Sequence, residues 1–400
     1  MTATQAARKL PGEEESQCTP LRLTLVISSL SLGGAERVMS IMANYWAERG
    51  WPVSLVTLDI AANDFYSLHP SVHRVALGVS GISTTPVEAV RSNARRITRL
   101  RQAIRTLRPE AVISFLAPTT MLTVLAARSE RVPVIVSDRT DPTQYRLGTF
   151  WSWVRRMVYP HASAVVVQTP EVKRWAERVV PANIVYTIPN PVVATQRRES
   201  TPAASAAHGM REGFAPQIVA MGRLHSDKGF DDLLRAFARA NGAERGWRLL
   251  ILGEGPERQR LETLSDTLGV AAAVSLPGRV KEPDNILRQS DLFVLSSRYE
   301  GFPNALLEAM AVGLPVIAAD CPSGPRHIVR HGIDGILVPP GDIDAMASAM
   351  VQVLGDERLR TALAARASEV FDRFGIDRVM AEWDRLLRRV TPSLRLTHSS

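Results

Sequence analysis

Residues 292–308 read LFVLSSRYEGFPNALLE. The four apolar residues at 292–295 predict a short buried strand, and the apolar positions within 305–312 predict a helix. Gly301 stands in the polar loop between them, where a residue without a side chain lets a ligand approach the backbone closely. Strand, loop and helix form the repeating unit of α/β folds, whose ligands bind at the carboxyl ends of the strands. This stretch therefore predicts both the fold class and the place of a site.

The same alternation continues in both directions along the chain. Further strands are predicted at 21–28, 53–58, 111–115, 132–137 and 164–168, and again at 217–221, 247–252, 274–276 and 316–318. Helices are predicted at 35–50, 230–240 and 259–268. Strands separated by helices at this spacing imply parallel sheets that are covered on both faces.

Two such blocks are joined by a segment without periodicity, residues 195–216, which is rich in Ala, Ser, Pro and Arg. The predicted organisation is a flexible leader at 1–20, a Rossmann-like domain at 21–194, a linker at 195–216, a second Rossmann-like domain at 217–375 and a terminal helix at 376–392. Apolar residues recur at helical spacing in the last segment, at Val379, Trp383, Leu386, Leu387 and Val390. This helix is expected to pack back across the first domain.

The composition is that of a globular protein with two cores, since 45% of the 400 residues are hydrophobic and 22% are charged. No apolar run is long enough to span a bilayer. The N-terminus, with Glu13, Glu14 and Glu15, lacks the apolar region of a signal peptide. Cys18 and Cys321 are the two cysteines, too few for a disulfide framework and consistent with a reducing compartment. We therefore expect a cytoplasmic protein.

The surplus of positive charge lies in the first half of the chain. Residues 1–195 hold 22 Lys and Arg against 14 Asp and Glu, whereas residues 196–400 hold 26 of each. Residues 91–108 contain seven arginines and no acid, with apolar residues at helical spacing. An aromatic-basic cluster follows at Phe150, Trp151, Trp153, Arg155, Arg156 and Tyr159. Together these features predict peripheral attachment to an anionic membrane surface; a solvated helix face and a packed aromatic segment are the alternative. No nucleic-acid-binding motif is present in the sequence.

Glu300 and Glu308 flank the loop-to-helix junction with seven residues between them. Glu300 lies on the predicted loop and Glu308 about one turn into the helix, so both can face one ligand. Carboxylates suit the hydroxyls of ribose and hexose, because each accepts two hydrogen bonds. The N–H groups at the start of the helix, residues 304–306, are free to bind phosphate. The alternative is a helix entry with two ordinary surface glutamates.

Two further motifs follow predicted strands. In residues 222–229 (GRLHSDKG), Arg223 and Lys228 lie at the carboxyl edge of the second sheet. Two cations there can hold a diphosphate and stabilise it as a leaving group, although two solvated loop cations are the alternative. Gly33 and Gly34, between the first strand and the first helix, allow a phosphate or substrate to approach the backbone. A tight turn alone would also explain this glycine pair.

In combination, the three motifs resemble those of glycosyltransferase family 4, whose members have the GT-B fold and retain the anomeric configuration of the sugar. The resemblance covers about residues 21–390. Residues 113–116 (ISFL) and 137–142 (SDRTDP) resemble the branch that extends polyprenyl-pyrophosphate-linked sugars for polysaccharides or glycoproteins. The implied fold is α/β, with two doubly wound Rossmann-like domains, a cleft between them and a C-terminal helix that crosses back.

The resemblance also implies a role for each motif residue. Arg223 and Lys228 match the pair that grips the donor diphosphate. Glu300 matches the residue that contacts the donor hexose, and Glu308 the residue that holds the ribose. Other donor-side positions match the loops around the nucleobase, the phosphates and the sugar: Gly33, Gly34, Arg279, Val280, Gly301, Phe302, Asn304, Ala305 and Leu306. On the acceptor side are Asp138 and Arg139; many members carry a histidine near the latter position, and arginine here favours an anionic acceptor group.

The implied reaction is a front-face attack, in which the departing phosphate oxygen takes the proton of the acceptor hydroxyl. No metal is required, because Arg223 and Lys228 would replace it. Asp342-Ile-Asp344 has the spelling of a metal motif, but Asp342 is interpreted as a helix cap. The expected partners are a nucleotide-sugar donor, a UDP-sugar in preference to a GDP-sugar, and a lipid-linked glycan acceptor. A nucleotide-sugar-binding protein without turnover and a GT-B-fold sugar-nucleotide 2-epimerase are the alternatives.

Overall fold

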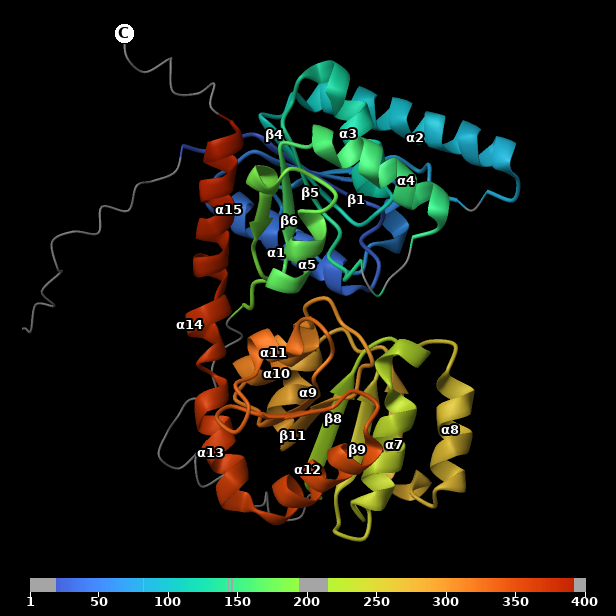
Figure 1. The fold of residues 1–400 in the computed structure, drawn as a ribbon, viewed down its shortest axis with the longest axis vertical. Coiled ribbons are helices and arrows are strands. Elements are labelled where there is room, and N and C mark those ends of the chain that lie inside the picture. The colour runs from blue at the N-terminus through green and yellow to red at the C-terminus, as the bar shows by residue number, and fades with distance from the viewer. Residues whose placement is uncertain (1–18, 82, 143, 145–146, 194–214, 392–400) are drawn as a thin grey trace, which may run out of the picture.

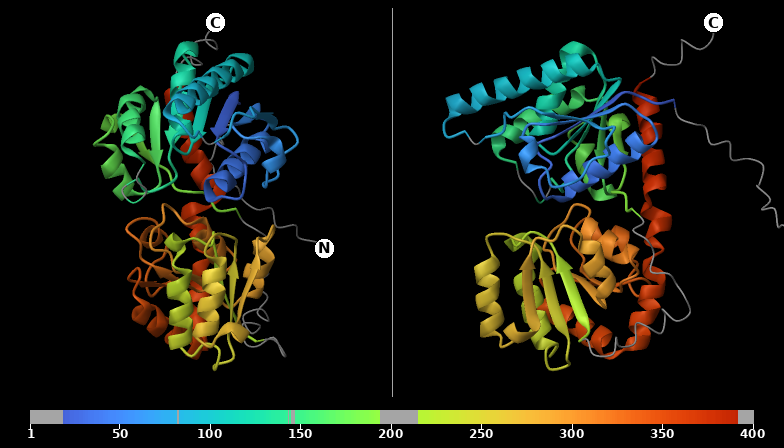
Figure 2. Two further views of the ribbon diagram at one scale, coloured as in Figure 1. Left: turned by 90° about the vertical axis from the view of Figure 1, so that its right-hand side faces the viewer. Right: turned by 180° about the vertical axis from the view of Figure 1, so that it is seen from behind.

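The computed structural model describes residues 19–81, 83–142, 144, 147–193 and 215–391. Two sheets lie one above the other, and a C-terminal helical segment runs beside both (Figure 1). The sheets remain separate layers when seen from two other sides (Figure 2). Residues 1–18 of the predicted leader and residues 195–214 of the predicted linker lie outside the described residues.

Within the described residues, the first sheet has seven parallel strands in the order β3-β2-β1-β4-β5-β6-β7. They are β1 (Leu23–Ile27), β2 (Val53–Thr57), β3 (His73–Ala76), β4 (Ala111–Phe115), β5 (Val134–Ser137), β6 (Ala164–Val167) and β7 (Val185–Thr187). All five strands predicted for this half form, and each is buried along its whole length. Strands buried on both faces are largely apolar, which is why the sequence reveals them.

The sequence pattern predicts neither β3 nor β7, the two edge strands of this sheet. β3 reads HRVA and is at least partly exposed along its length, and β7 has three residues. Neither strand forms an apolar run, because an edge strand is less completely covered than a central one.

Different helices cover the two faces of the first sheet. α1 (Gly34–Glu48) and the C-terminal helix α15 (Ile376–Val390) pack on one face. The other face is covered by α2 (Pro86–Leu107), α3 (Thr119–Ala127), α4 (Thr149–Val158) and α5 (Pro170–Ala176). α2 begins at Thr85, whose side chain accepts a hydrogen bond from the N–H of Glu88, as is common at helix starts.

The second sheet is also parallel, in the order β10-β9-β8-β11-β12-β13. Its strands are β8 (Gln217–Met221), β9 (Arg248–Leu252), β10 (Val274–Gly278), β11 (Leu292–Leu295), β12 (Val316–Ala319) and β13 (Ile336–Val338). One face is covered by α7 (Phe230–Arg239), α8 (Arg258–Thr267) and α12 (Ile343–Gly355). The other face carries α9 (Pro283–Gln289), α10 (Asn304–Ala311), α11 (Pro325–Ile328) and α14 (Val370–Phe374), and α13 (Glu357–Ala367) contributes side chains to both cores.

Short 3-10 turns connect several of these elements: η1 (Ala61–Asn63), η2 (Arg128–Glu130), η3 (Tyr159–His161), η4 (Ala182–Ile184), η5 (Ser226–Lys228) and η6 (Ala271–Ala273). Asp342 caps α12 as predicted, since its carboxylate accepts a hydrogen bond from the N–H of Ala345 at 2.9 Å. Asp344 pairs instead with Arg239. In the part of the chain that the structure describes, no helix combines the length and apolar character needed to cross a membrane.

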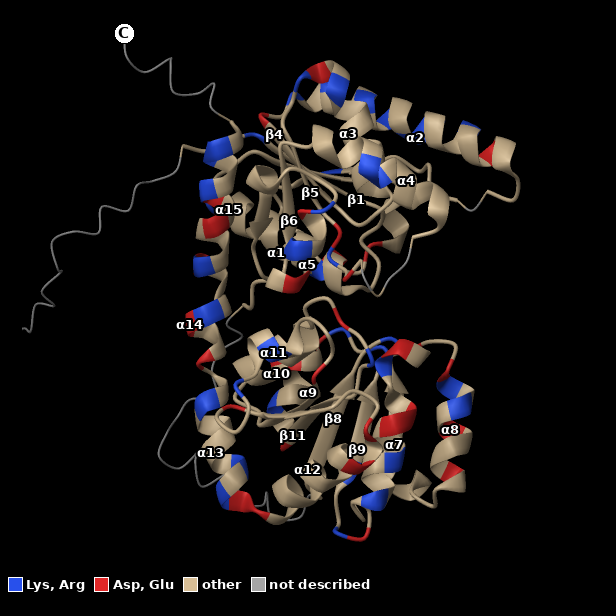
Figure 3. Ribbon diagram, in the orientation of Figure 1, with Lys and Arg blue, Asp and Glu red and all other residues tan. Residues whose placement is uncertain are grey.

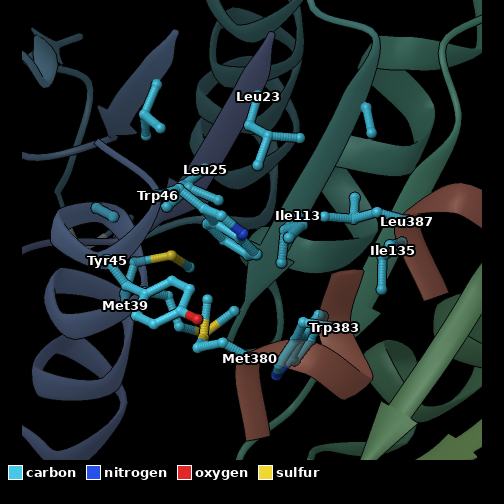
Figure 4. Packing of buried hydrophobic residues seen from close by; sticks show 14 of the residues in the cluster. Leu23, Leu25, Met39, Tyr45, Trp46, Ile113, Ile135, Met380, Trp383 and Leu387 are labelled. Atoms are coloured by element: carbon cyan, nitrogen blue, oxygen red, sulfur yellow. The ribbon is translucent and has the colours of Figure 1, made fainter. Parts of the chain in front are cut away.

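The terminal helix α15 belongs to the core of the first domain, as the sequence predicts. Trp383 and Leu387 are fully buried together with Trp46 of α1 and Ile113 of β4 (Figure 4). The indole N–H of Trp46 donates a hydrogen bond to Asp384 at 2.8 Å. Burying one large apolar side chain contributes roughly 2 kcal/mol, so this interface ties the end of the chain firmly to the first domain.

Candidate active site

Loops at the carboxyl ends of strands from both sheets meet at one place. The turn after β1 carries Gly33 and Gly34, and the loop after β11 carries Glu300 and Gly301. The side-chain amide of Asn304 donates to the carbonyl of Gly34 at 2.8 Å, which joins these two loops. In α/β folds the carboxyl ends of the strands are where ligands bind, so the meeting point of the two domains is the candidate site.

Lys228 and Glu300 are the central pair of side chains that the second domain supplies to the candidate site. The Lys228 ammonium lies 2.6 Å from the Glu300 carboxylate, which also accepts a hydrogen bond from Ser297 at 2.7 Å. Burial acts most strongly, to lower the pKa of Lys228, but the charge and hydrogen bond of Glu300 together with the charge of Asp227 outweigh it, so the pKa is raised above its ordinary value. Gly229 has φ of +61°, and a side chain there would collide with the carbonyl of Ser296. The turn η5 therefore needs this glycine to present a charged lysine to the carboxylate.

Arg223, also in the loop after β8, is exposed and faces the first domain. Burial raises the pKa of Glu36, at the start of α1, and the charge of Arg223 partly offsets that rise. Glu36 of the first domain therefore lies close enough to Arg223 of the second domain for their charges to interact. A diphosphate placed between the domains would meet Arg223 and Lys228 together.

The start of α10 is hydrogen-bonded to the first domain. The side-chain amide of Asn190 donates to the carbonyl of Phe302 at 3.0 Å and to the side-chain oxygen of Asn304 at 2.7 Å. The ring of Phe302 is buried against Phe374, and Leu306 is also buried. Phe302, Ala305 and Leu306 can therefore serve a ligand through their backbone, and the first N–H groups of a helix have no acceptor within it.

Glu308, one turn into α10, is paired with Arg37 of α1. The Arg37 Nε lies 2.7 Å from Glu308 Oε1, and its Nη2 lies 3.8 Å from Asp284. Burial raises the pKa of Glu308 to about 7, although the charge of Arg37 acts to lower it and that of Asp284 to raise it. The carboxyl group predicted to hold a ribose thus changes its charge near neutral pH.

The glycine pair allows the two domains to approach each other. A side chain at Gly33 would collide with Glu36, and one at Gly34 would lie 3.3 Å from the amide nitrogen of Asn304. The hydroxyl of Tyr66 donates to the carbonyl of Gly33 at 3.0 Å and fixes this turn. The turn thus lies against Asn304 of the second domain, and the approach of a phosphate or substrate to its backbone stays a prediction.

An open hollow of about 380 Å³ lies beside the Arg37–Glu308 pair. It is lined by Arg37, Lys281, Glu282, Pro283, Asp284, Asn285 and Arg288. Arg279 is exposed and Val280 half-buried in the segment that leads into this wall from β10. The volume falls within the range of small-molecule sites. Arg279 and Val280, predicted to contact the base, directly precede the lining residue Lys281 in the sequence but do not line the hollow themselves.

The predicted acceptor-side residues are arranged differently. Asp138 accepts hydrogen bonds from Arg155 at 3.0 Å and from the hydroxyl of Tyr159. The guanidinium of Arg139 lies 4.0 Å from the ring centre of Phe115 and donates to Asn190 at 2.6 Å. Burial lowers the pKa of Arg139 to about 9. Both side chains are directed into the first domain, and the structure does not bring them to Lys228 and Glu300.

The backbone of this loop, in contrast, does reach the candidate site. The carbonyl oxygen of Arg139 would lie 3.2 Å from a side chain at Gly301. The hydroxyl of Ser323 lies 2.9 Å from both Asp141 Oδ2 and the carbonyl of Glu300. Asp141 and Ser323 therefore link the loops after β5 and β12 to the loop of Glu300.

One prediction about the aromatic-basic cluster is wrong in part. Arg155 and Tyr159 are buried because they hold Asp138 inside the first domain, so they do not belong to a surface cluster. Phe150 and Trp153 are 62% and 61% exposed. Helical periodicity separates these two groups, since a helix places residues three or four apart on the same face.

Arg37, Asn190 and Ser323 also lie at the candidate site, although none of them is among the residues predicted for it. Arg37 follows the glycine pair by about one helical turn. Its place in the sequence GGAER, directly after that pair, is the one feature that could have indicated a position at the site. Asn190 precedes a proline at the end of the first block. Its role, like that of Ser323, depends on contacts with the opposite domain. Contacts between residues of different domains leave no local pattern in the sequence.

Family models match both halves of the chain. A model described as "Glycosyl transferase 4-like domain" matches residues 33–191, and one described as "Glycosyl transferases group 1" matches residues 210–370. Residues 192–209 lie between the two matched ranges.

Curated relatives include proteins of bacterial glycan synthesis. An exopolysaccharide phosphotransferase of Streptomyces coelicolor is 33% identical over 72% of this chain, which spans 29% of that protein. An alpha-1,4-N-acetyl-D-galactosaminyltransferase of Campylobacter jejuni, named for an undecaprenol-PP-linked glycan, is 26% identical over 92% of this chain and 99% of that enzyme. An amylovoran biosynthesis glycosyltransferase of Erwinia amylovora is 25% identical, with 92% of this chain and 99% of that protein covered.

Solved structures with the same arrangement include sucrose-phosphate synthase from Thermosynechococcus elongatus and HepE from Anabaena in complex with UDP and glucose. The first has a TM-score of 0.77 at 20% identity, over 93% of this chain and 100% of that one. The second has a TM-score of 0.74 at 17% identity, over 92% and 99%. At such identities the likeness establishes the fold, and it confirms the predicted two-domain GT-B architecture.

Proposed function

Because the chain belongs to the glycosyltransferases of the GT-B fold, we propose that it is a retaining, metal-independent member of family 4. Its reaction would transfer a hexose or N-acetylhexosamine from a nucleotide diphosphate sugar to a lipid-linked glycan. The observation that carries this proposal is the charged pair Lys228–Glu300, 2.6 Å apart, beside the start of α10 and the half-buried Glu308. Such a set offers cations to a diphosphate and carboxylates to sugar hydroxyls.

The donor would lie across these groups in order. Arg223 and Lys228 would bind the diphosphate, and Glu300 would accept hydrogen bonds from the hexose. The N–H groups at the start of α10 would face the phosphates, as helix N-termini do. Glu308 would hold the ribose, with the base in the hollow of about 380 Å³ beyond it. A UDP-sugar is the favoured donor, and the UDP in the HepE complex agrees with that choice.

In the proposed reaction the acceptor hydroxyl oxygen attacks the anomeric carbon on the face that the diphosphate leaves. The bond from that carbon to the diphosphate oxygen breaks as the new glycosidic bond forms, and the departing oxygen takes the hydroxyl proton. The products are the lengthened glycan and a nucleoside diphosphate. The protein then has to position both reactants and stabilise the negative charge on the leaving group, for which two cations suffice.

The lipid-linked acceptor is supported by the Campylobacter relative, whose name includes an undecaprenol-PP glycan. It is also supported by one face of the first domain. Arg91, Arg95 and Arg99 recur every four residues along α2 and are exposed. Segments of α2 are blue in Figure 3, where blue marks Lys and Arg. On α4, exposed Phe150, Trp153 and Met157 recur at helical spacing. Arginines beside exposed aromatic side chains favour attachment to an anionic bilayer, probed below.

The transferase is tested by incubating the protein with labelled UDP-, GDP- and ADP-sugars and a bacterial lipid extract, with EDTA throughout. We expect label from one donor in the organic phase. Lys228→Ala and Glu300→Ala should each reduce it about 100-fold or more, the usual effect of losing one contact to developing charge. Lys173→Ala, at an exposed ion pair on α5, is the matched control. Nucleotide binding without transfer would favour the binding-only alternative, and loss of transfer in EDTA would contradict metal independence.

Membrane attachment is tested with Phe150→Ser/Trp153→Ser. Co-sedimentation with vesicles containing anionic phosphatidylglycerol should fall about tenfold, because each exposed aromatic ring would lose burial in the interface. Transfer to a water-soluble acceptor analogue should remain. Vesicle binding equal to that of the unaltered protein would assign the exposed aromatic side chains another role.

A further inference from the structure

Glu308 is held by a side chain of the opposite domain. Arg37 Nε lies 2.7 Å from Glu308 Oε1, and the two side chains are 26% and 12% exposed. Arg37 stands three residues after Gly34, so the glycine turn that approaches α10 also delivers this guanidinium. The contact uses Oε1, so a ribose hydroxyl can approach through Oε2. The pair is thus part of the proposed donor site and at the same time a bridge between the domains.

Three elements bring ionisable side chains to Glu308. α1 brings Arg37, the start of α9 brings Asp284, and the segment between η1 and β3 brings Tyr66. Burial raises the pKa of Tyr66 to about 12, so it is neutral, and Asp284 opposes ionisation of Glu308. Arg37 supplies the positive charge that favours the carboxylate.

The charge of Glu308 matters for what it can bind. A carboxylate accepts hydrogen bonds at both oxygens and can receive both hydroxyls of a ribose, whereas a protonated carboxyl has one oxygen converted to a donor. Glu308 is buried enough to titrate near neutral pH, at about 7. A nucleotide therefore needs a group that keeps this carboxyl ionised.

We propose that Arg37 is a positioning residue of the donor site: it supplies, from the first domain, the counter-charge of Glu308, so that the ribose subsite is complete only when the two domains are closed. This inference rests on the proposed function, in which Glu308 receives the ribose. It also couples closure to donor binding, since opening the cleft would take Arg37 away from Glu308 and remove the charge that favours its carboxylate form.

The test compares Arg37→Met, Arg37→Lys and Arg49→Met by titration calorimetry with UDP and with GDP between pH 6 and 9. Arg49 lies at the other end of α1 in an exposed pair with Asp377 and is the matched control. Without the guanidinium the pKa of Glu308 rises further, so the carboxyl is protonated over a wider range. The affinity of Arg37→Met relative to the unaltered protein should be about tenfold lower at pH 6, the effect of one pKa unit, and should recover toward equality at pH 9.

Arg37→Lys keeps a charge and should recover most of the affinity, and Arg49→Met should bind like the unaltered protein. Titration of the nucleotide itself cancels in these ratios. In a Glu308→Gln background, Arg37→Met should cause no further pH-dependent loss. A defect in Arg37→Met of the same size at every pH, or none at all, would overturn the inference. If the unaltered protein binds neither nucleotide, the proposed function fails first, which is a distinct result.

Discussion

The loop after β11 and the loop after β5 come from different domains and are in contact at Gly301 and Arg139, yet their charged side chains have different kinds of partner. In the first, the Glu300 carboxylate pairs with Lys228 of the loop after β8 at 2.6 Å. In the second, Asp138 and Arg139 turn into their own domain, against Arg155 and Phe115. Both loops follow buried parallel strands at carboxyl ends. Position on the fold therefore indicates where a site lies, but not which side chains enter it.

The physical reason lies in what each side chain finds nearby. Glu300 has a lysine and a serine hydroxyl at the cleft, so its charge is satisfied there. Asp138 finds a buried guanidinium and a tyrosine hydroxyl inside the first domain. Arg139 has φ of +56°, and its guanidinium stacks on Phe115 inside the first domain. A buried charged side chain adopts the orientation in which it meets an oppositely charged or hydrogen-bonding partner, because burying an unpaired charge costs free energy.

The comparison between the two loops is tested most strongly at Asp138, where the largest loss of stability is expected. In Asp138→Ala the buried Arg155 loses its carboxylate; their side chains are 9% and 7% exposed. The free energy of unfolding should fall by about 3 kcal/mol, as for other buried pairs that lose one partner. Chemical denaturation measures this loss. The donor KM of the folded fraction should stay near that of the unaltered protein.

The double variant Asp138→Ala/Arg155→Met provides the control for that prediction, because it removes both charges and should recover much of the stability. A strong rise in donor KM for Asp138→Ala, with stability unchanged, would instead put Asp138 in the site and make the two loops alike.

A smaller effect is expected where the two loops touch. In Gly301→Ala the added methyl group would lie 3.2 Å from the carbonyl of Arg139 and 3.3 Å from the Cα of Thr140. These backbone atoms have to move by a few tenths of an ångström, so closure of the cleft should be hindered by about 1 kcal/mol. Steady-state kinetics should show transfer reduced about fivefold. Gly148→Ala, where a methyl group meets open space, is the control and should leave transfer unchanged.

Much of the architecture could be predicted from the sequence. The central strands appear as apolar runs because they are buried on both faces, and α15 is recognisable from Trp383 and its neighbours at helical spacing. The edge strands β3, β7 and β13 are not predicted: HRVA in β3 contains no apolar run, and β7 and β13, with three residues each, are too short to show a pattern. The motif around Glu300 and Glu308 predicted the loop and the start of α10 correctly.

The sequence by itself determined the two α/β blocks, the residue types of the donor motifs and the return of the last helix to the first domain. These features follow from local periodicity and motif spacing, which can be recognised directly in the sequence. Only the tertiary structure decided that Glu308 is paired with Arg37, that Asn190 and Ser323 bridge the domains, and that Arg139 is turned inward. The contacts between the domains join residues more than a hundred positions apart, and burial, which only the complete fold defines, selects the partner of each charge.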